Sequence, residues 1–247
     1  MRTSLSPRRI TLEVCVTTAD EAVAAVAVGA DRLELCAALE VGGVTPSPAS
    51  FLDVREAASV PVCVLVRPRP GRFVYTTREW VTVRRDADWF LAHGADAIVA
   101  GVLDETGCLD RGRSRELVRA AAGGAVLHRA FDFLPSLVEG LSLAIDLGFA
   151  RVLTSGGSLT ASAGVEVIGR MRRQAAGRIE ILPGGDVTPA NVAALLAATG
   201  CDQVHGSFRS PAMTDRHALA RHLGAAAATD PTKVAAVRAE LNRIAAG

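Results

Sequence analysis

Short apolar runs and amphipathic stretches alternate along almost the whole chain. Runs rich in β-branched residues predict eight strands, at residues 10–16, 32–36, 61–66, 96–102, 125–132, 151–154, 179–182 and 203–205. The stretches between and after them have helical spacing, at residues 19–28, 47–58, 77–93, 111–121, 135–147, 160–174, 189–198 and 231–244. Strict alternation of strand and helix predicts a parallel sheet whose helices cover it.

A glycine-containing junction recurs four times, at residues 29–31, 94–96, 148–150 and 200–202. Each junction ends a predicted helix and starts a strand, where glycine suits a left-handed helix cap. The junctions precede strands two, four, six and eight, which indicates four copies of a double βα unit. We therefore predict one α/β domain over residues 1–247, a (β/α)8 TIM barrel. An open doubly wound sheet would break this repeat and usually carries Gly-x-Gly-x-x-Gly, and neither feature is visible.

Composition narrows the classes of function. The chain has 247 residues, 49% of them apolar, and a formal net charge of +1, which suits one globular body and gives no electrostatic footprint for nucleic acid. We expect no membrane span and, from residues 1–10, no secretory signal. Five widely spaced cysteines without a Cys-x-x-Cys predict reduced thiols and a cytoplasmic location.

Charged residues interrupt two of the apolar strands. Alternation along a strand places Glu13 with Cys15, and Glu34 with Cys36, on faces that we predict to point into the barrel. A buried carboxylate is costly unless it is paired. Arg67, directly after the third predicted strand, continues the face of that strand on which Cys63 and Leu65 lie. We predict that Arg67 pairs with the two glutamates. A structural ion network and a catalytic one are equally open at this point.

The fifth predicted strand ends in ionisable residues, namely His128, Arg129 and Asp132. Active sites of such barrels lie at the C-terminal ends of the strands, and imidazole is suited to proton transfer near neutral pH. The candidate catalytic residues are therefore Glu13, Glu34, Arg67, His128, Arg129 and Asp132.

Glycine pairs follow the sixth and seventh strands, and arginines lie close to several strand ends. Barrels commonly bind phosphate after strands seven and eight, where glycines allow backbone N–H groups to approach an anion. The predicted ligand-binding residues are Arg69, Ser155, Gly184, Gly185, His205, Ser207 and Arg209. The alternative reading of the glycine pairs is that they only connect strands to helices.

Eight segments together resemble the CutC family of copper homeostasis proteins: LEVCV at 12–16, GADRLELC at 29–36, GGVTPS at 42–47, RPR at 67–69, FVY at 73–75, HRAFD at 128–132, RVLTSG at 151–156 and PGG at 183–185. The resemblance covers about residues 10–209 and leaves a connecting segment, 210–230, and a closing helix, 231–247. It implies a cytoplasmic TIM barrel that binds copper(I) through Cys15 and Cys36. It also implies a homo-oligomer, with a dimer favoured.

The chain departs from the usual family pattern near two predicted loops. Pro70 and Arg72 replace a glycine and an acid, and Asp186 replaces a small residue. We expect Asp186 to oppose an anion at the predicted phosphate loop and Arg72 to offset it.

Three hypotheses follow from the sequence. The first is a copper-binding protein of the CutC kind. The second is a barrel enzyme acting on a small phosphorylated or carboxylated compound. The third is a barrel that binds a partner without catalysis. None of them requires nucleic acid or a membrane.

Overall fold

The computed structural model describes residues 9–211 and 227–246. Residues 1–8, which carry most of the N-terminal segment discussed above, and most of the connecting segment 210–230 lie outside the described residues.

Eight parallel strands form the centre of the molecule: β1 (Thr11–Val16), β2 (Arg32–Leu35), β3 (Val62–Leu65), β4 (Ala97–Ala100), β5 (Ala125–Leu127), β6 (Arg151–Thr154), β7 (Glu180–Pro183) and β8 (Gln203–Gly206). They are hydrogen-bonded in the order β7-β6-β5-β4-β3-β2-β1-β8. A parallel bridge between Gly184 and His205 joins the two edges and closes the barrel. The predicted (β/α)8 fold is confirmed.

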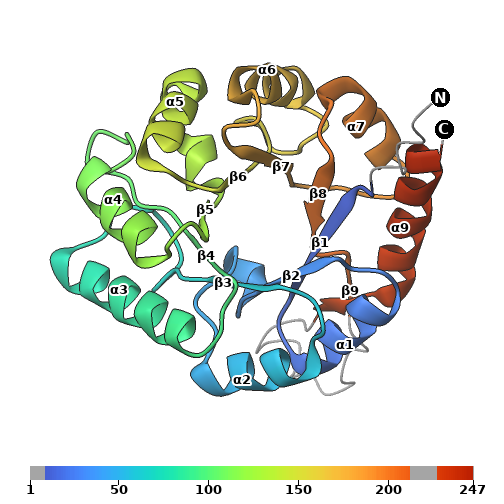
Figure 1. Cartoon of the computed structure of the whole chain (residues 1–247), viewed down its shortest axis with the longest axis horizontal. Helices are drawn as coiled ribbons and strands as arrows, with labels where there is room; N and C mark the ends of the chain where they lie inside the picture. Colours follow the sequence, from blue (N-terminus) through green and yellow to red (C-terminus); the bar gives the residue numbers. More distant parts are fainter. Residues whose placement is uncertain (1–8, 212–226, 247) are drawn as a thin grey trace, which may run out of the picture.

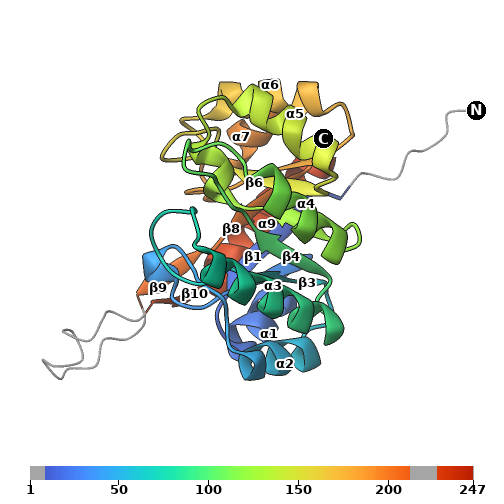
Figure 2. The same cartoon turned by 90° about the vertical axis from the view of Figure 1, so that its left-hand side faces the viewer.

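Helices surround the sheet on its outer side (Figure 1). They are α1 (Ala19–Ala27), α2 (Pro48–Ala57), α3 (Thr77–Ala92), α4 (Arg111–Ala120), α5 (Leu137–Leu147), α6 (Val165–Ala175), α7 (Val192–Thr199) and α9 (Pro231–Ala246). The 3-10 helix η1 (Leu39–Val41) follows β2. After β8, the strands β9 (Arg209–Pro211) and β10 (Ala227–Thr229) pair antiparallel and project from one end of the molecule (Figure 2).

The two faces of the strands pack against different partners. Leu12 and Val14 of β1 are fully buried in the large core between sheet and helices. Burying such a side chain contributes about 1.5–3 kcal/mol. Cys15, Cys63 and Val126 belong instead to a separate cluster inside the barrel. The predicted inward and outward alternation is therefore confirmed.

The segment after β5 differs from the prediction. The strand ends at Leu127, and the backbone turns into the 3-10 helix η2 (Arg129–Phe133). His128 is the N-cap of this helix, because its Nδ1 accepts a hydrogen bond from the backbone N–H of Ala130 at 3.1 Å. Arg129 and Asp132 are thus carried by a short helix that contacts β6, and they do not end the strand itself.

Helix α6 begins five residues later than predicted, at Val165. Gly164 lies so close to the backbone of Ser155 that a Cβ atom at Gly164 would be 1.9 Å from the Ser155 carbonyl oxygen. The segment before α6 therefore packs against the end of β6 as a turn. Helix α7 also begins later than predicted, at Val192. It follows a turn in which the side-chain oxygen of Asn191 accepts a hydrogen bond from the backbone N–H of Thr188.

Candidate functional site at the mouth of the barrel

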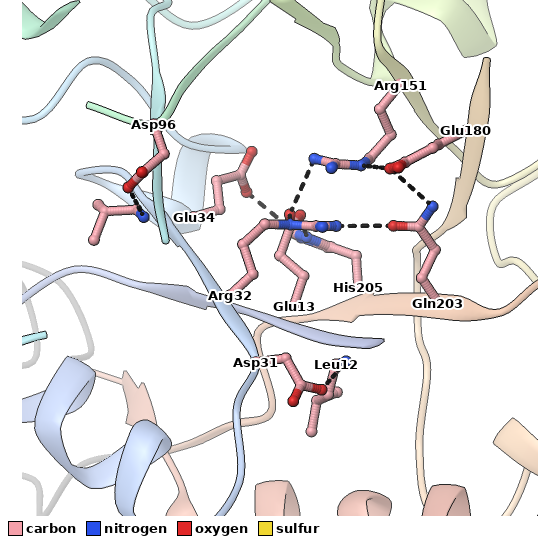
Figure 3. Close-up of polar contacts among 11 residues, drawn as sticks. Leu12, Glu13, Asp31, Arg32, Glu34, Asp96, Arg151, Glu180, Gln203 and His205 are labelled. Carbon is pink, nitrogen blue, oxygen red and sulfur yellow. Dashed lines mark hydrogen bonds and ion pairs between the residues drawn. The ribbon is translucent and has the colours of Figure 1, made fainter. Parts of the chain in front are cut away.

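A layer of charged residues fills the part of the barrel where several strands begin (Figure 3). Its centre is Glu13, which is 2% exposed and forms an ion pair with Arg32 of β2. His205 Nδ1 lies 2.8 Å from Glu13 Oε1, and Arg151 lies 3.7 Å from Glu13 Oε2. Burial raises the pKa of Glu13, but Arg32, His205 and Arg151 outweigh it, so the pKa falls well below its usual range. Glu13 is therefore a carboxylate with fixed partners.

The same layer continues around the barrel (Figure 3). Arg32 Nη2 donates to Gln203 Oε1 at 2.9 Å, and Arg151 Nε donates to Glu180 Oε2 at 2.7 Å. These four residues were missed as site residues by the sequence reasoning, although each is the first residue of its strand. Arg32 and Arg151 hold Glu13 in place, and Gln203 and Glu180 hydrogen-bond to these two arginines. None of the four lines the cavity at the mouth of the barrel.

A cavity of about 560 Å³ opens at the C-terminal ends of the strands. Four of its lining residues are cationic: Arg67, Arg129, Arg209 and Lys233. Two are acidic, Glu34 and Asp186, and two are histidines, His128 and His205. Lys233 comes from α9 and was not predicted, because nothing in the sequence indicates that this helix packs beside the mouth.

Arg67 is buried but does not pair with the glutamates, so that prediction was wrong. Its guanidinium donates to the backbone carbonyls of Val41 at 3.2 Å, Gly43 at 2.9 Å and Gly71 at 2.9 Å. It also lies over the ring of Phe73, 4.9 Å from the centroid. Arg67 thus fastens two loops together. Because no carboxylate in the described part of the chain forms an ion pair with it, its charge acts on the cavity.

His128 lies in the wall of the cavity and is 5% exposed. Burial, with a further contribution from the charge of Arg67, lowers its pKa to about 3, so the imidazole is neutral. Its Nδ1 accepts a hydrogen bond from the backbone N–H of Ala130, so the proton of the neutral ring is on Nε2. Nε2 has no hydrogen-bond partner among the described residues. Gly101 leaves the space for this ring, since a Cβ there would lie 2.7 Å from Nδ1.

Asp132 accepts hydrogen bonds from the backbone N–H groups of Ser155 and Gly157, each at 3.1 Å, and from the hydroxyl of Thr154. Arg129 donates to Asp132 at 2.8 Å and to the Ser155 hydroxyl at 2.7 Å. Only Arg129 of this group lines the cavity. Asp132 and Ser155 therefore shape the loop after β6, and Arg129, whose charge is partly offset by Asp132, lines the cavity.

The other predicted ligand-binding residues also divide into those that line the cavity and those that do not. Gly185, His205, Ser207 and Arg209 line the cavity, whereas Gly184 forms the bridge that closes the barrel. Arg69 is outside the lining and forms an ion pair with Glu79.

Two of the three departures from the family pattern, Asp186 and Arg72, carry charge and take different positions. Asp186 lines the cavity, in a left-handed conformation with φ 58°. Arg72 is exposed and absent from the lining, so the expected offset between them does not occur at this cavity.

The floor of the cavity carries two thiols, a carboxylate and an imidazole. Cys15 Sγ lies 3.4 Å from Cys36 Sγ, and His205 Nε2 lies 3.5 Å from Glu34 Oε2. The hydrogen bond with Cys36, burial and the charge of Glu34 raise the pKa of the Cys15 thiol well above its usual range. Burial raises the pKa of Glu34. The pKa of His205 is lowered by burial, but Glu34 and Glu13 reverse this and the net shift is upward.

The fold and this cavity define a (β/α)8 barrel protein with a site at the C-terminal mouth of the strands whose charged side chains are mainly cationic. A sequence model of the CutC family matches residues 10–210, and the chain belongs to that family. The predicted membership is confirmed.

Relatives and solved structures agree with this assignment. The chain is 43% identical to a protein named as a family protein CutC of Caulobacter vibrioides, over 84% of each chain. It is 42% identical to one of Rhizobium meliloti, over 96% of this chain and 98% of the relative. The crystal structure of CutC from Streptococcus agalactiae, described as a candidate copper homeostasis protein, is 30% identical, with a TM-score of 0.76 over 80% of this chain and 98% of that one. Within the described residues, every helix is too short or too polar to cross a membrane.

Proposed function

We propose that this CutC-family protein is a barrel enzyme that binds a small phosphorylated or carboxylated compound in the mouth cavity. The observation that carries the proposal is a set of three buried polar donors, on cavity-lining residues, that have no hydrogen-bond partner among the described residues. They are Nε of Arg67, Nε2 of His128 and Nη1 of Arg209. A buried donor without an acceptor costs about 1–3 kcal/mol, and a bound oxyanion would supply that acceptor.

The charge around the cavity supports an anion as the ligand. Its lining contains two more cationic side chains than acidic ones, before either histidine is counted. Arg129 and Arg67 are held in position by hydrogen bonds to the protein, so neither needs to be ordered on binding. The volume of about 560 Å³ lies in the range typical of small-molecule sites.

Isothermal titration with inorganic phosphate and phosphoglycolate tests this proposal. We expect binding of at least one probe that weakens about tenfold or more in Arg209→Gln, since a hydrogen bond to a charged group contributes about 1.5–3 kcal/mol. Arg69→Gln is the matched control, because Arg69 is an arginine outside the cavity. Absence of binding by the wild-type protein, or equal affinities in the two variants, would contradict the proposal.

Copper(I) is the second candidate ligand. It would be an ion that the protein binds and releases, and not a resident cofactor. The observation that favours it is the 3.4 Å separation of the Cys15 and Cys36 sulfurs, since thiolates suit Cu(I). Both thiols must lose their protons on binding, so copper uptake would release protons. A Cu(I) titration under reducing conditions is expected to show near-stoichiometric binding that disappears in a Cys15→Ser, Cys36→Ser double variant. Undiminished binding in that variant would remove this candidate.

Cytoplasmic location and self-association belong to the same proposal. An odd number of cysteines suits a reducing compartment. Three large apolar side chains, Phe133, Val138 and Leu159, are 68%, 58% and 93% exposed on neighbouring segments between η2 and the loop after β6. Apolar groups that protrude in this way favour contact with a second copy. Light scattering of the purified protein is expected to give the mass of a dimer, and a monomer in Phe133→Ser.

A further inference from the structure

We infer that the floor of the cavity is a site for a divalent metal ion of the zinc class, held by Cys15 Sγ, the Glu34 carboxylate and Nε2 of His205. This inference deepens the proposed function, because the ion would lie where the anionic compound presents its reacting oxygen. It assigns a different ion and a different set of donor atoms from the copper(I) pair that the family name implies.

The donor atoms are already close together. One ligand atom from each of Cys15, Glu34 and His205 lies within 4.8 Å of the other two. Zinc binds sulfur at about 2.3 Å and nitrogen or oxygen at about 2.0–2.2 Å, so tetrahedral donors lie roughly 3.3–3.8 Å apart. The distance of 3.5 Å from His205 Nε2 to Glu34 Oε2 falls in that range. Small side-chain rotations would bring the sulfur to the same separation.

The orientation of His205 is that of a metal-ligating histidine. Such residues almost always give their second ring nitrogen to a carboxylate, which fixes the ring and its tautomer. Nδ1 of His205 lies 2.8 Å from Glu13 Oε1, which leaves Nε2 directed toward Glu34 (Figure 3). Glu13 is itself fixed by Arg32 and is 2% exposed, so this support is rigid.

The chemistry of the donors decides which ion fits. Copper(I) selects soft thiolate and thioether ligands, whereas a set of one thiolate, one imidazole and one carboxylate suits a borderline divalent ion. Catalytic zinc sites use three protein ligands and keep one position for water or substrate. All three residues line the open cavity, so the remaining position would face the ligand. A zinc ion bound there would polarise an oxygen of the ligand as a Lewis acid.

The experiment measures zinc binding by untagged protein in competition with a chromophoric chelator. We expect one Zn²⁺ per chain in the wild type, with affinity reduced at least about 100-fold in Cys15→Ser and His205→Gln. Cys36→Ser is the matched control, because it removes the neighbouring thiol and should change affinity less than about fivefold. Cobalt(II) substitution should give a thiolate charge-transfer band in wild type and Cys36→Ser that is absent in Cys15→Ser.

Each remaining outcome contradicts the inference. Failure of the wild type to bind stoichiometric zinc, retention of binding in Cys15→Ser, or equal loss in Cys36→Ser and Cys15→Ser would overturn it. Circular dichroism of each variant shows whether it has folded, and Glu34→Gln replaces His205→Gln if the latter does not. Phosphate titration of the zinc-free wild type keeps the two proposals apart, since anion binding without zinc binding removes only the metal site.

Discussion

Two histidines face the same cavity and have opposite electrostatic environments. His128 sits beside the ring of Phe73, 4.9 Å away between centroids, and near the charge of Arg67. Its pKa falls to about 3 because burial and a nearby cation both disfavour imidazolium. His205 lies between the carboxylates of Glu13 and Glu34, and its pKa is raised despite burial. The side chains around each ring, and not the residue type, decide whether an imidazole here is a neutral donor or a partner of carboxylates.

The difference also separates two tasks within one cavity. The His128 side of the wall offers neutral or cationic donors, which suit an anion. The His205 side offers a thiol, a carboxylate and an imidazole, which suit a cation. An anionic ligand and a metal ion could therefore occupy the cavity together without competing for the same side chains.

The largest expected effect comes from breaking the environment of His205. In Glu13→Gln, the largely buried guanidinium groups of Arg32 and Arg151 lose the carboxylate that they share. Removing one partner of a buried ion pair costs about 3–5 kcal/mol, so urea unfolding should show a loss of that order. A loss below about 1 kcal/mol would mean that the layer is not held together by Glu13.

The environment of His128 predicts a dependence of stability on pH. The folded pKa of about 3 lies below the usual value of 6.5, so the unfolded chain binds more protons between these values. The contribution of neutral His128 is complete above pH 6.5 and is lost as the pH falls toward 3. Between pH 7 and pH 4 the loss amounts to about 3 kcal/mol.

This effect is measured as a difference between two proteins. The free energy of unfolding in urea is measured for the wild type and for His128→Gln at both pH values. Subtracting one protein from the other removes the contribution of every group that titrates in both. The wild type should lose more stability than the variant on acidification. Parallel losses would show that His128 is accessible to protons in the folded state.

A smaller effect is expected from the glycine that makes room for His128. The Cβ of Gly101→Ala would approach the imidazole to 2.7 Å, and overpacking of this kind costs about 1–3 kcal/mol. Gly112→Ala in α4 is the matched control, because its Cβ meets only Asp110, at 3.5 Å, and should stabilise the helix by about 0.5–1 kcal/mol. Thermal unfolding should therefore shift in opposite directions. Shifts of the same sign would contradict the close fit around His128.

The smallest effect is expected at Arg69. Its guanidinium pairs with Glu79 at the surface and hydrogen-bonds to the carbonyls of Arg72 and Val74. Because it does not line the cavity, Arg69→Gln should change the affinity for inorganic phosphate less than about twofold. A loss as large as that expected for Arg209→Gln would contradict binding of the anion in the mouth cavity.

The sequence by itself determined the fold and the directions of the side chains. Alternation of strands and helices predicted the closed barrel, and period-two alternation predicted that Glu13 and Cys15 point inward while Leu12 points outward. These features depend on local periodicity, which is visible along the chain. The polar residues of the mouth, including His128 and Arg209, could be found because they lie at or just after predicted strand ends, where such barrels carry their sites.

Only the tertiary structure decided which of these residues are partners. Glu13 pairs with Arg32, Arg151 and His205, which lie up to 192 residues away, because strand register brings them to one layer. Arg67 instead binds loop carbonyls, and Lys233 reaches the mouth from α9. Pairing depends on barrel closure and on loop paths between distant segments. A periodic pattern carries no information about either, so the carboxylates could be predicted from the sequence but their partners could not.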